Sequence, residues 1–210
     1  MARDLDALMT SATVIPVIVI DRIEHAEPLG RALVAGGLNV LEVTLRTPVA
    51  LEAIRLMARE VEGAVVGAGT VLNAGDAERA REAGSEFLVS PGLTPQLAQA
   101  CQALDVALLP GVSTAGEIMG GLELGLNRFK FFPAENVGGA PALKALAGPF
   151  GGVKFCPTGG ISLGSAPTYL ALPNVLCVGG AWVAPKDKME AGDWAGITEL
   201  ARQAKALKAA

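Results

Sequence analysis

Residues 39–61 read NVLEVTLRTPVALEAIRLMAREV, and this stretch contains the unit from which the fold is predicted. Its first part, residues 39–46, is dominated by Val and Leu, which is typical of a buried strand. Its second part, Pro48 to Val61, is rich in Ala, Leu, Glu and Arg, which favour a helix. The stretch therefore predicts one strand followed by one helix.

The same unit recurs along the chain, with helix-forming stretches between apolar, β-rich runs. These runs begin near Val14, Val40, Val65, Phe87, Val106, Phe129, Val153 and Val175. Strands that alternate with helices predict a parallel sheet, and near-continuous apolar strands fit a sheet covered on both faces. Eight units predict a closed (β/α)8 TIM barrel. An open doubly wound sheet is the alternative, because the spacing of the runs does not prove closure.

No shift in composition marks a linker, so a single domain is predicted over residues 1–210. A chain of this length can bury roughly 70% of its unfolded surface, which is enough for one sizeable core. The residues before Thr13 predict an extra N-terminal helix, and those after Asp193 predict the closing helix.

Composition excludes several partners. The chain has 17 Lys and Arg against 21 Asp and Glu and no basic runs, which argues against binding to nucleic acid. Its longest apolar run, Ala12 to Ile20, is far shorter than the roughly 18 to 20 residues that span a membrane. Three cysteines stand far apart without a CxxC pair, which fits a cytoplasmic location.

Histidine is nearly absent, since His25 is the one histidine of the sequence. This excludes metal sites that need two imidazoles, and it excludes a Ser-His-Asp triad unless His25 is the base. We expect no metal and no cofactor, with the chemistry carried mainly by Lys, Glu, Asp, Arg, Thr or backbone amides. His25 itself is expected at the surface or at a helix start.

Charged side chains interrupt two of the apolar strands. In residues 39–46 the period of two places Glu42, Thr44 and Arg46 on one face, and the leucines on the other. In residues 128–133 the same period places Lys130 and Phe132 together. If the apolar faces meet the helices, a lysine and a glutamate point into the same barrel.

A lysine in such a place has a chemical use. An ammonium group among phenylalanines is poorly solvated, which favours the free amine that attacks a ketone to form a Schiff base. A carboxylate such as Glu42 can move the protons that this reaction requires. Two alternatives stay open: a Lys130–Glu42 ion pair that merely closes the core, and Lys154 as the reactive amine, although Lys154 is near the start of its strand.

Two glycine pairs follow the last two predicted strands. Thr158-Gly159-Gly160 and Gly179-Gly180-Ala181 offer bare backbone amides at the usual phosphate position of this fold. Tight turns alone are the other explanation for such glycines. The Gly67-Ala68-Gly69 stretch is no dinucleotide fingerprint, because the third glycine is missing.

Five blocks of sequence resemble one enzyme family. They are residues 42–47 (EVTLRT), 67–72 (GAGTVL), 90–94 (SPGLT), 130–135 (KFFPAE) and 155–161 (FCPTGGI). Their order and spacing, from about Ile15 to Pro185, are similar to those of the 2-keto-3-deoxy-6-phosphogluconate (KDPG) and 4-hydroxy-2-oxoglutarate (KHG) aldolases.

The resemblance implies a homotrimeric class I aldolase of the Entner–Doudoroff pathway. Such an enzyme cleaves KDPG to pyruvate and glyceraldehyde 3-phosphate, and often KHG to pyruvate and glyoxylate. Lys130 matches the Schiff-base lysine and Glu42 the general acid and base. The substrate-binding positions implied are Arg46, Thr70 and Thr158 for the carboxylate, Pro91 and Phe132 as pocket walls, and Gly159, Gly160, Gly179, Gly180 and Ala181 for the phosphate end.

Two departures affect the expected substrate preference. Ala181 stands where the family commonly has serine, so a hydroxyl contact to phosphate is missing, and Gly116 also replaces a usual serine. Two further function classes remain alternatives: a metal-dependent lyase or phosphosugar isomerase, which EDTA should inactivate, and a barrel that binds a keto acid without turnover, which should release no pyruvate.

Overall fold

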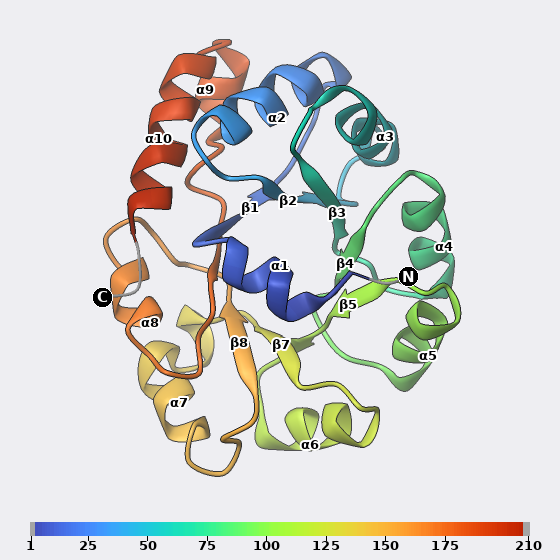
Figure 1. Cartoon of the computed structure of the whole chain (residues 1–210), viewed down its shortest axis with the longest axis vertical. Coiled ribbons are helices and arrows are strands. Elements are labelled where there is room, and N and C mark those ends of the chain that lie inside the picture. The colour runs from blue at the N-terminus through green and yellow to red at the C-terminus, as the bar shows by residue number, and fades with distance from the viewer. Residues whose placement is uncertain (1–2, 208–210) are drawn as a thin grey trace.

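A computed structural model describes residues 3–207. The strands are β1 (Val14–Ile18), β2 (Val40–Thr44), β3 (Val65–Gly69), β4 (Phe87–Val89), β5 (Ala107–Leu109), β6 (Gly111–Val112), β7 (Arg128–Phe131), β8 (Lys154–Pro157) and β9 (Val178–Gly180). The helices are α1 (Leu5–Ser11), η1 (Ile23–His25), α2 (Ala26–Ala35), α3 (Ala50–Glu60), α4 (Ala74–Glu82), α5 (Pro95–Ala103), α6 (Ala115–Glu123), η2 (Glu135–Val137), α7 (Gly139–Leu146), α8 (Ala166–Leu170), α9 (Lys186–Glu190) and α10 (Trp194–Ala206). Figure 1 shows the helices as a ring around the strands. Seven of the eight predicted strand starts fall within one residue of an observed start, and Val175 lies three residues before β9.

The predicted closed barrel of eight strands is wrong. The strands form a six-stranded parallel sheet in the order β5-β4-β3-β2-β1-β9 and a separate sheet in the order β6-β7-β8. Together they make a curled (β/α) barrel whose ladder is broken at two places. The first break is Pro110, which separates β5 from β6 and lacks the N–H group that a continuous ladder needs.

The second break lies between β8 and β9. Two isolated bridges connect them, Phe155 with Val175 and Thr158 with Gly179. The sequence offset is 20 residues at the first bridge and 21 at the second, so the β9 side carries one extra residue between them. An extra residue on one strand interrupts regular pairing in the manner of a β-bulge. Apolar periodicity alone carries no sign of it.

Alternating side chains divide the core into two layers, as the period of two predicts. Leu41 and Val43 of β2 pack in the larger layer between strands and helices, where Phe129 and Phe131 of β7 also lie. The smaller layer fills the inside of the barrel, and Val40 belongs to it. Glu42 and Lys130 therefore project into the barrel, as the sequence predicts.

Helix α1 lies across the barrel in the view of Figure 1. It covers seven residues, and its buried Leu8 and Met9 pack with the interior layer at the end where the strands begin. Arg128, at the start of β7, holds α1 by two contacts to the Asp6 carboxylate. The opposite end, where the strands finish, carries the loops in which the site residues were predicted.

Candidate active site

Lys130 and Glu42 meet inside the barrel. The Lys130 Nζ atom donates a hydrogen bond to Glu42 Oε1 over 3.1 Å. The two side chains are 7% and 4% exposed, and they come from β7 and β2, which belong to different sheets. Side-chain alternation along the two strands predicts that both residues point into the barrel, and the structure places them in direct contact.

The carboxylate of Glu42 occupies space that only a glycine leaves free. Gly69 ends the neighbouring strand β3, where it pairs with Thr44 of β2, and a Cβ atom at Gly69 would lie 2.2 Å from Glu42 Oε1. A Cβ at Gly67 would likewise collide with the Phe87 ring, 2.5 Å away. The two glycines are two residues apart on β3 and so lie on the same face, and the Phe87 and Glu42 side chains that they meet show that this face is the interior. Neither glycine was predicted to have this role, because the period of two does not show which side chain of another strand fills the space beside a glycine.

Apolar and backbone groups surround Lys130. The centre of the Phe132 ring lies 5.2 Å from Lys130 Nζ, within the range of a cation–π contact. Lys130 pairs in register with Gly111 on one side and Cys156 on the other. A Cβ at Gly111 would lie 2.2 Å from the Pro91 carbonyl oxygen, so the loop after β4 reaches the strand beside Lys130.

Arg46 and Thr70 follow the ends of β2 and β3. Arg46 is exposed, and its Nε donates to Thr44 Oγ1 over 3.1 Å, while that hydroxyl donates to the Ile18 carbonyl over 2.8 Å. This chain of hydrogen bonds connects the guanidinium to β1. Thr70 has a φ of 60°, a left-handed conformation that is uncommon outside glycine and is often found at functional sites.

The two glycine pairs lie side by side at the ends of β8 and β9. Thr158 forms a bridge with Gly179, and a Cβ at Gly179 would lie 2.2 Å from Thr158 Oγ1. Gly159 and Gly160 both have positive φ values, 105° and 78°. Gly180 ends β9, and Ala181 follows it at the surface.

The rival lysine lies elsewhere. Lys154 begins β8, and its Nζ donates to the Pro173 carbonyl over 2.8 Å. His25 lies in η1 with its ring edge-on to Trp194 at 5.7 Å, in agreement with the predicted helix start. Within residues 3–207, no group of three or more His, Cys, Asp or Glu side chains is arranged to hold a metal ion.

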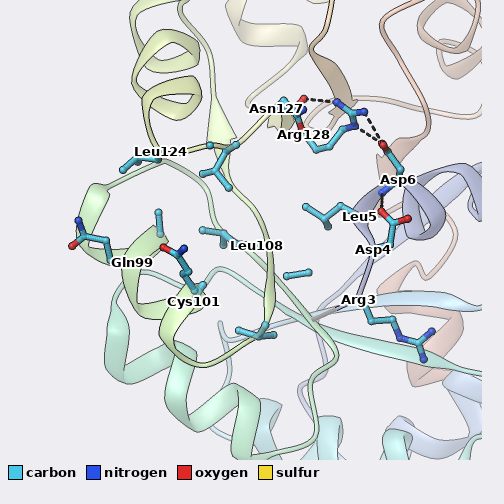
Figure 2. A pocket seen from close by; sticks show the side chains of 16 residues that line it. Arg3, Asp4, Leu5, Asp6, Gln99, Cys101, Leu108, Leu124, Asn127 and Arg128 are labelled. Atoms are coloured by element: carbon cyan, nitrogen blue, oxygen red, sulfur yellow. Dashed lines mark hydrogen bonds and ion pairs between the residues drawn. The ribbon is translucent and has the colours of Figure 1, made fainter. Parts of the chain in front are cut away.

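A separate hollow of about 440 Å³ opens at the other end of the barrel, beside α1 (Figure 2). Its lining includes Leu5, Leu108 and Arg128, and the Arg128–Asp6 ion pair borders it. Arg128 begins β7, whereas the Lys130 ammonium meets Glu42 further along. The hollow is therefore not part of the site around Lys130.

Comparison with known protein families identifies the family of this chain. Residues 5–200 match the family described as KDPG and KHG aldolase. The chain belongs to this aldolase family. The resemblance seen in the five sequence blocks is thereby confirmed, and the protein is an aldolase, a lyase that acts on carbon–carbon bonds. A member from Zymomonas mobilis, 2-dehydro-3-deoxy-phosphogluconate aldolase, is 61% identical over 99% of this chain and 98% of its own. The KHG/KDPG aldolase of Escherichia coli K12 is 54% identical over 95% of this chain and 93% of its own.

Solved structures of aldolases agree in fold as well. The 2-keto-3-deoxy-6-phosphogluconate aldolase of Zymomonas mobilis with 3-phosphoglycerate has a TM-score of 0.95 at 60% identity, covering 100% of this chain and 99% of that one. The KDPG aldolase of Legionella pneumophila, in which pyruvate is captured as a covalent carbinolamine intermediate, has a TM-score of 0.94 at 47% identity, covering 97% and 98%. In the part of this chain that the structure describes, no helix is long and apolar enough to cross a membrane.

Proposed function

We propose that this aldolase cleaves KDPG to pyruvate and glyceraldehyde 3-phosphate by class I chemistry, with Lys130 as the Schiff-base residue and Glu42 as the general acid and base. The observation that carries the proposal is the buried contact of 3.1 Å between Lys130 Nζ and Glu42 Oε1. A buried ion pair contributes little net stability, whereas an amine beside a carboxylate suits imine chemistry.

The reaction proceeds through an imine on Lys130. Glu42 takes a proton from the ammonium, and the free amine attacks the C2 carbonyl of KDPG to give a carbinolamine. Glu42 then returns its proton to the carbinolamine hydroxyl, which leaves as water to give a protonated imine. The C3–C4 bond breaks, its electrons move into the imine, and the Glu42 carboxylate takes the proton of the C4 hydroxyl as glyceraldehyde 3-phosphate leaves. Glu42 gives this proton to C3 of the enamine, and addition of water to the resulting imine releases pyruvate and the free lysine.

The remaining site residues bind the two charged ends of the substrate. Arg46 supplies a cation for the carboxylate at C1, with the Thr70 and Thr158 hydroxyls as further donors. Pro91 and Phe132 form the walls around the reacting carbons. The backbone amides of Gly159, Gly160, Gly179 and Gly180 bind the phosphate, because bare amides at strand ends are suited to anions. Ala181 borders the phosphate without a hydroxyl.

KHG is proposed as a second substrate, because it contains the same 2-keto-4-hydroxy acid end around the bond that breaks, with a carboxylate at C5 in place of the phosphorylated end of KDPG. A homotrimer is proposed from the family resemblance, and Met119 and Leu122 on α6, 57% and 43% exposed, are side chains that a subunit contact could cover. A cytoplasmic location is proposed as well, since Cys101, Cys156 and Cys177 are all free thiols. Light scattering of the purified protein measures the trimer.

Borohydride trapping tests the proposal. Incubation with pyruvate and borohydride should reduce the imine to a stable secondary amine, and peptide mapping should place the adduct on Lys130. Lys130→Met should abolish the adduct, and Lys154→Met should retain it. An adduct on Lys154, or none, would overturn the assignment. EDTA should leave KDPG cleavage unchanged, and loss of activity would favour a metal-dependent lyase instead.

A further inference from the structure

Behind the first glycine pair, an acidic side chain and a buried tyrosine form a contact that the reaction scheme does not use. Glu135 is in the short helix η2 and Tyr169 is in α8. The Tyr169 hydroxyl donates to Glu135 Oε1 over 2.7 Å. Tyr169 is 2% exposed, whereas Glu135 is at the surface.

Backbone hydrogen bonds connect residues 134–135 to the turn at Gly159 and Gly160, which is the proposed phosphate site. The N–H of Ala134 donates to the Thr158 carbonyl over 2.8 Å, and the N–H of Glu135 donates to the Gly159 carbonyl over 3.1 Å. In a trans peptide the C=O and the following N–H point in opposite directions. With both carbonyls turned toward η2, the N–H groups of Gly159 and Gly160 point away from it, as donors for an anion.

The side chain of Glu135 also supports the turn by contact. A Cβ atom at Gly160 would lie 2.7 Å from Glu135 Cγ, so the methylene stem of the glutamate packs directly on the glycine. Glu135 also lines a hollow between α7 and α8 together with Gly139, Thr168 and Tyr169. In the part of the chain that the structure describes, the Tyr169 hydroxyl is the one hydrogen-bond donor to the Glu135 carboxylate.

We propose that Glu135 and Tyr169 are positioning residues for the phosphate: the glutamate stem supports the Gly159–Gly160 turn, and the tyrosine holds the carboxylate toward α8. This inference rests on the proposed function, in which the turn binds phosphate. An unrestrained carboxylate next to that turn would repel the phosphate, because like charges within a few ångströms destabilise each other. The hydroxyl of Tyr169 therefore acts on substrate affinity through Glu135, without touching the substrate.

The pKa of Tyr169 agrees with this arrangement. Burial and the hydrogen bond to the Glu135 carboxylate raise the pKa of Tyr169, so the phenol keeps its proton and remains a donor.

The test compares a phosphorylated ligand with an unphosphorylated one. Tyr169→Phe should raise the KM for KDPG about threefold to tenfold, because the released Glu135 carboxylate at the protein surface repels the phosphate through partly screening solvent. The kcat should stay within about twofold, and so should the pyruvate concentration for half-maximal borohydride trapping, because neither depends on phosphate contacts. The double variant Tyr169→Phe with Glu135→Gln should recover most of the KM, since a neutral amide does not repel phosphate. Thr198→Val, which removes a hydroxyl from α10, is the matched control and should leave both values unchanged.

The outcomes distinguish failure of the positioning role of Tyr169 and Glu135 from failure of the proposed phosphate site. A Tyr169→Phe variant with unchanged KM for KDPG, or with equal losses for KDPG and pyruvate, would overturn the positioning role. The positioning role would also be overturned if adding Glu135→Gln to Tyr169→Phe did not lower the raised KM for KDPG. A tyrosine with a purely structural role would give that result, because removing the charge of Glu135 would then not matter. Gly160→Ala should raise the KM for KDPG strongly, since its Cβ would collide with Glu135. If it does not, the phosphate turn itself is wrongly assigned, and the inference fails with it.

Discussion

Lys130 Nζ and Glu42 Oε1 are 3.1 Å apart, and their side chains connect the two sheets of the barrel from within. The cost of removing two charges from water is only partly offset by their attraction, so such a pair is a poor source of stability. In the mechanism that we propose, the contact keeps a proton donor and a proton acceptor adjacent at the carbon that reacts. The proposed chemistry accounts for the interior position of the pair better than a gain in stability does.

Glu42→Gln tests whether the Lys130–Glu42 pair serves proton transfer and not stability. The amide retains an oxygen that accepts a hydrogen bond from Lys130 Nζ but takes up no proton. We expect kcat for KDPG cleavage to fall by about 10² to 10⁴, the usual contribution of general acid–base catalysis. Circular dichroism and the thermal midpoint should show a folded protein. A variant with wild-type kcat would remove Glu42 from the mechanism.

Gly69→Ala should disturb the same carboxylate without touching its chemistry. The new Cβ would lie 2.2 Å from Glu42 Oε1, which is far inside van der Waals contact. Glu42 must therefore move, and we expect kcat to fall at least about tenfold, with a stability loss of about 1 to 3 kcal/mol from overpacking.

Gly120→Ala is the matched control for that substitution. Gly120 lies within α6, and a Cβ there meets no atom within 4 Å. Replacing a helical glycine by alanine should stabilise the protein by about 0.5 to 1 kcal/mol and leave kcat unchanged. Steady-state kinetics and urea unfolding of both variants measure the contrast. Equal kcat for Gly69→Ala and Gly120→Ala would show that Glu42 tolerates displacement.

The contrast between these glycines shows where sequence reasoning succeeds and where it stops. A period of two was enough to place Glu42 and Lys130 inside the barrel, because side chains on a strand must alternate. The period of two shows where side chains point, and a glycine has no side chain. It therefore did not show that Glu42 fills the space beside Gly69, and Gly69 was noted only as part of a motif. The space that Gly69 of β3 leaves free is filled by the Glu42 carboxylate of β2, which the sequence around Gly69 does not show.

The same limit explains the error in the fold. Alternating strands and helices were predicted correctly, because each apolar run is followed by its own helix. Closure depends on hydrogen bonds between strands, and Pro110 and the one-residue offset between the two β8–β9 bridges both interrupt them. Similarly, the Glu135–Tyr169 contact joins residues 34 positions apart, and no local pattern predicts it.

Ala181→Ser tests whether the alanine at position 181, where the family commonly has serine, weakens the preference for the phosphorylated substrate. Ala181 is exposed directly after β9, so a serine hydroxyl can be added there without burial. A new hydrogen bond to the phosphate should lower the KM for KDPG, by about tenfold if it is worth roughly 1.5 kcal/mol. The KM for KHG should stay the same, because that substrate has no phosphate. Equal changes for KDPG and KHG would mean that position 181 does not face the phosphate.

Helix α1 should become less firmly held in acid. Two contacts from Arg128 hold the pKa of Asp6 below its ordinary value of 3.8. Because the folded pKa is the lower one, the stabilisation is present above about pH 4 and is lost as the pH falls through the folded value. Asp6 is half exposed, so the pair should contribute less than about 1 kcal/mol. Asp6→Asn should therefore be slightly less stable than the parent at pH 7 and equal to it once the pH is below the lowered pKa of Asp6. Urea unfolding along a series of falling pH values measures this, and a difference that does not shrink as the pH falls would mean that the carboxylate charge is not what holds α1.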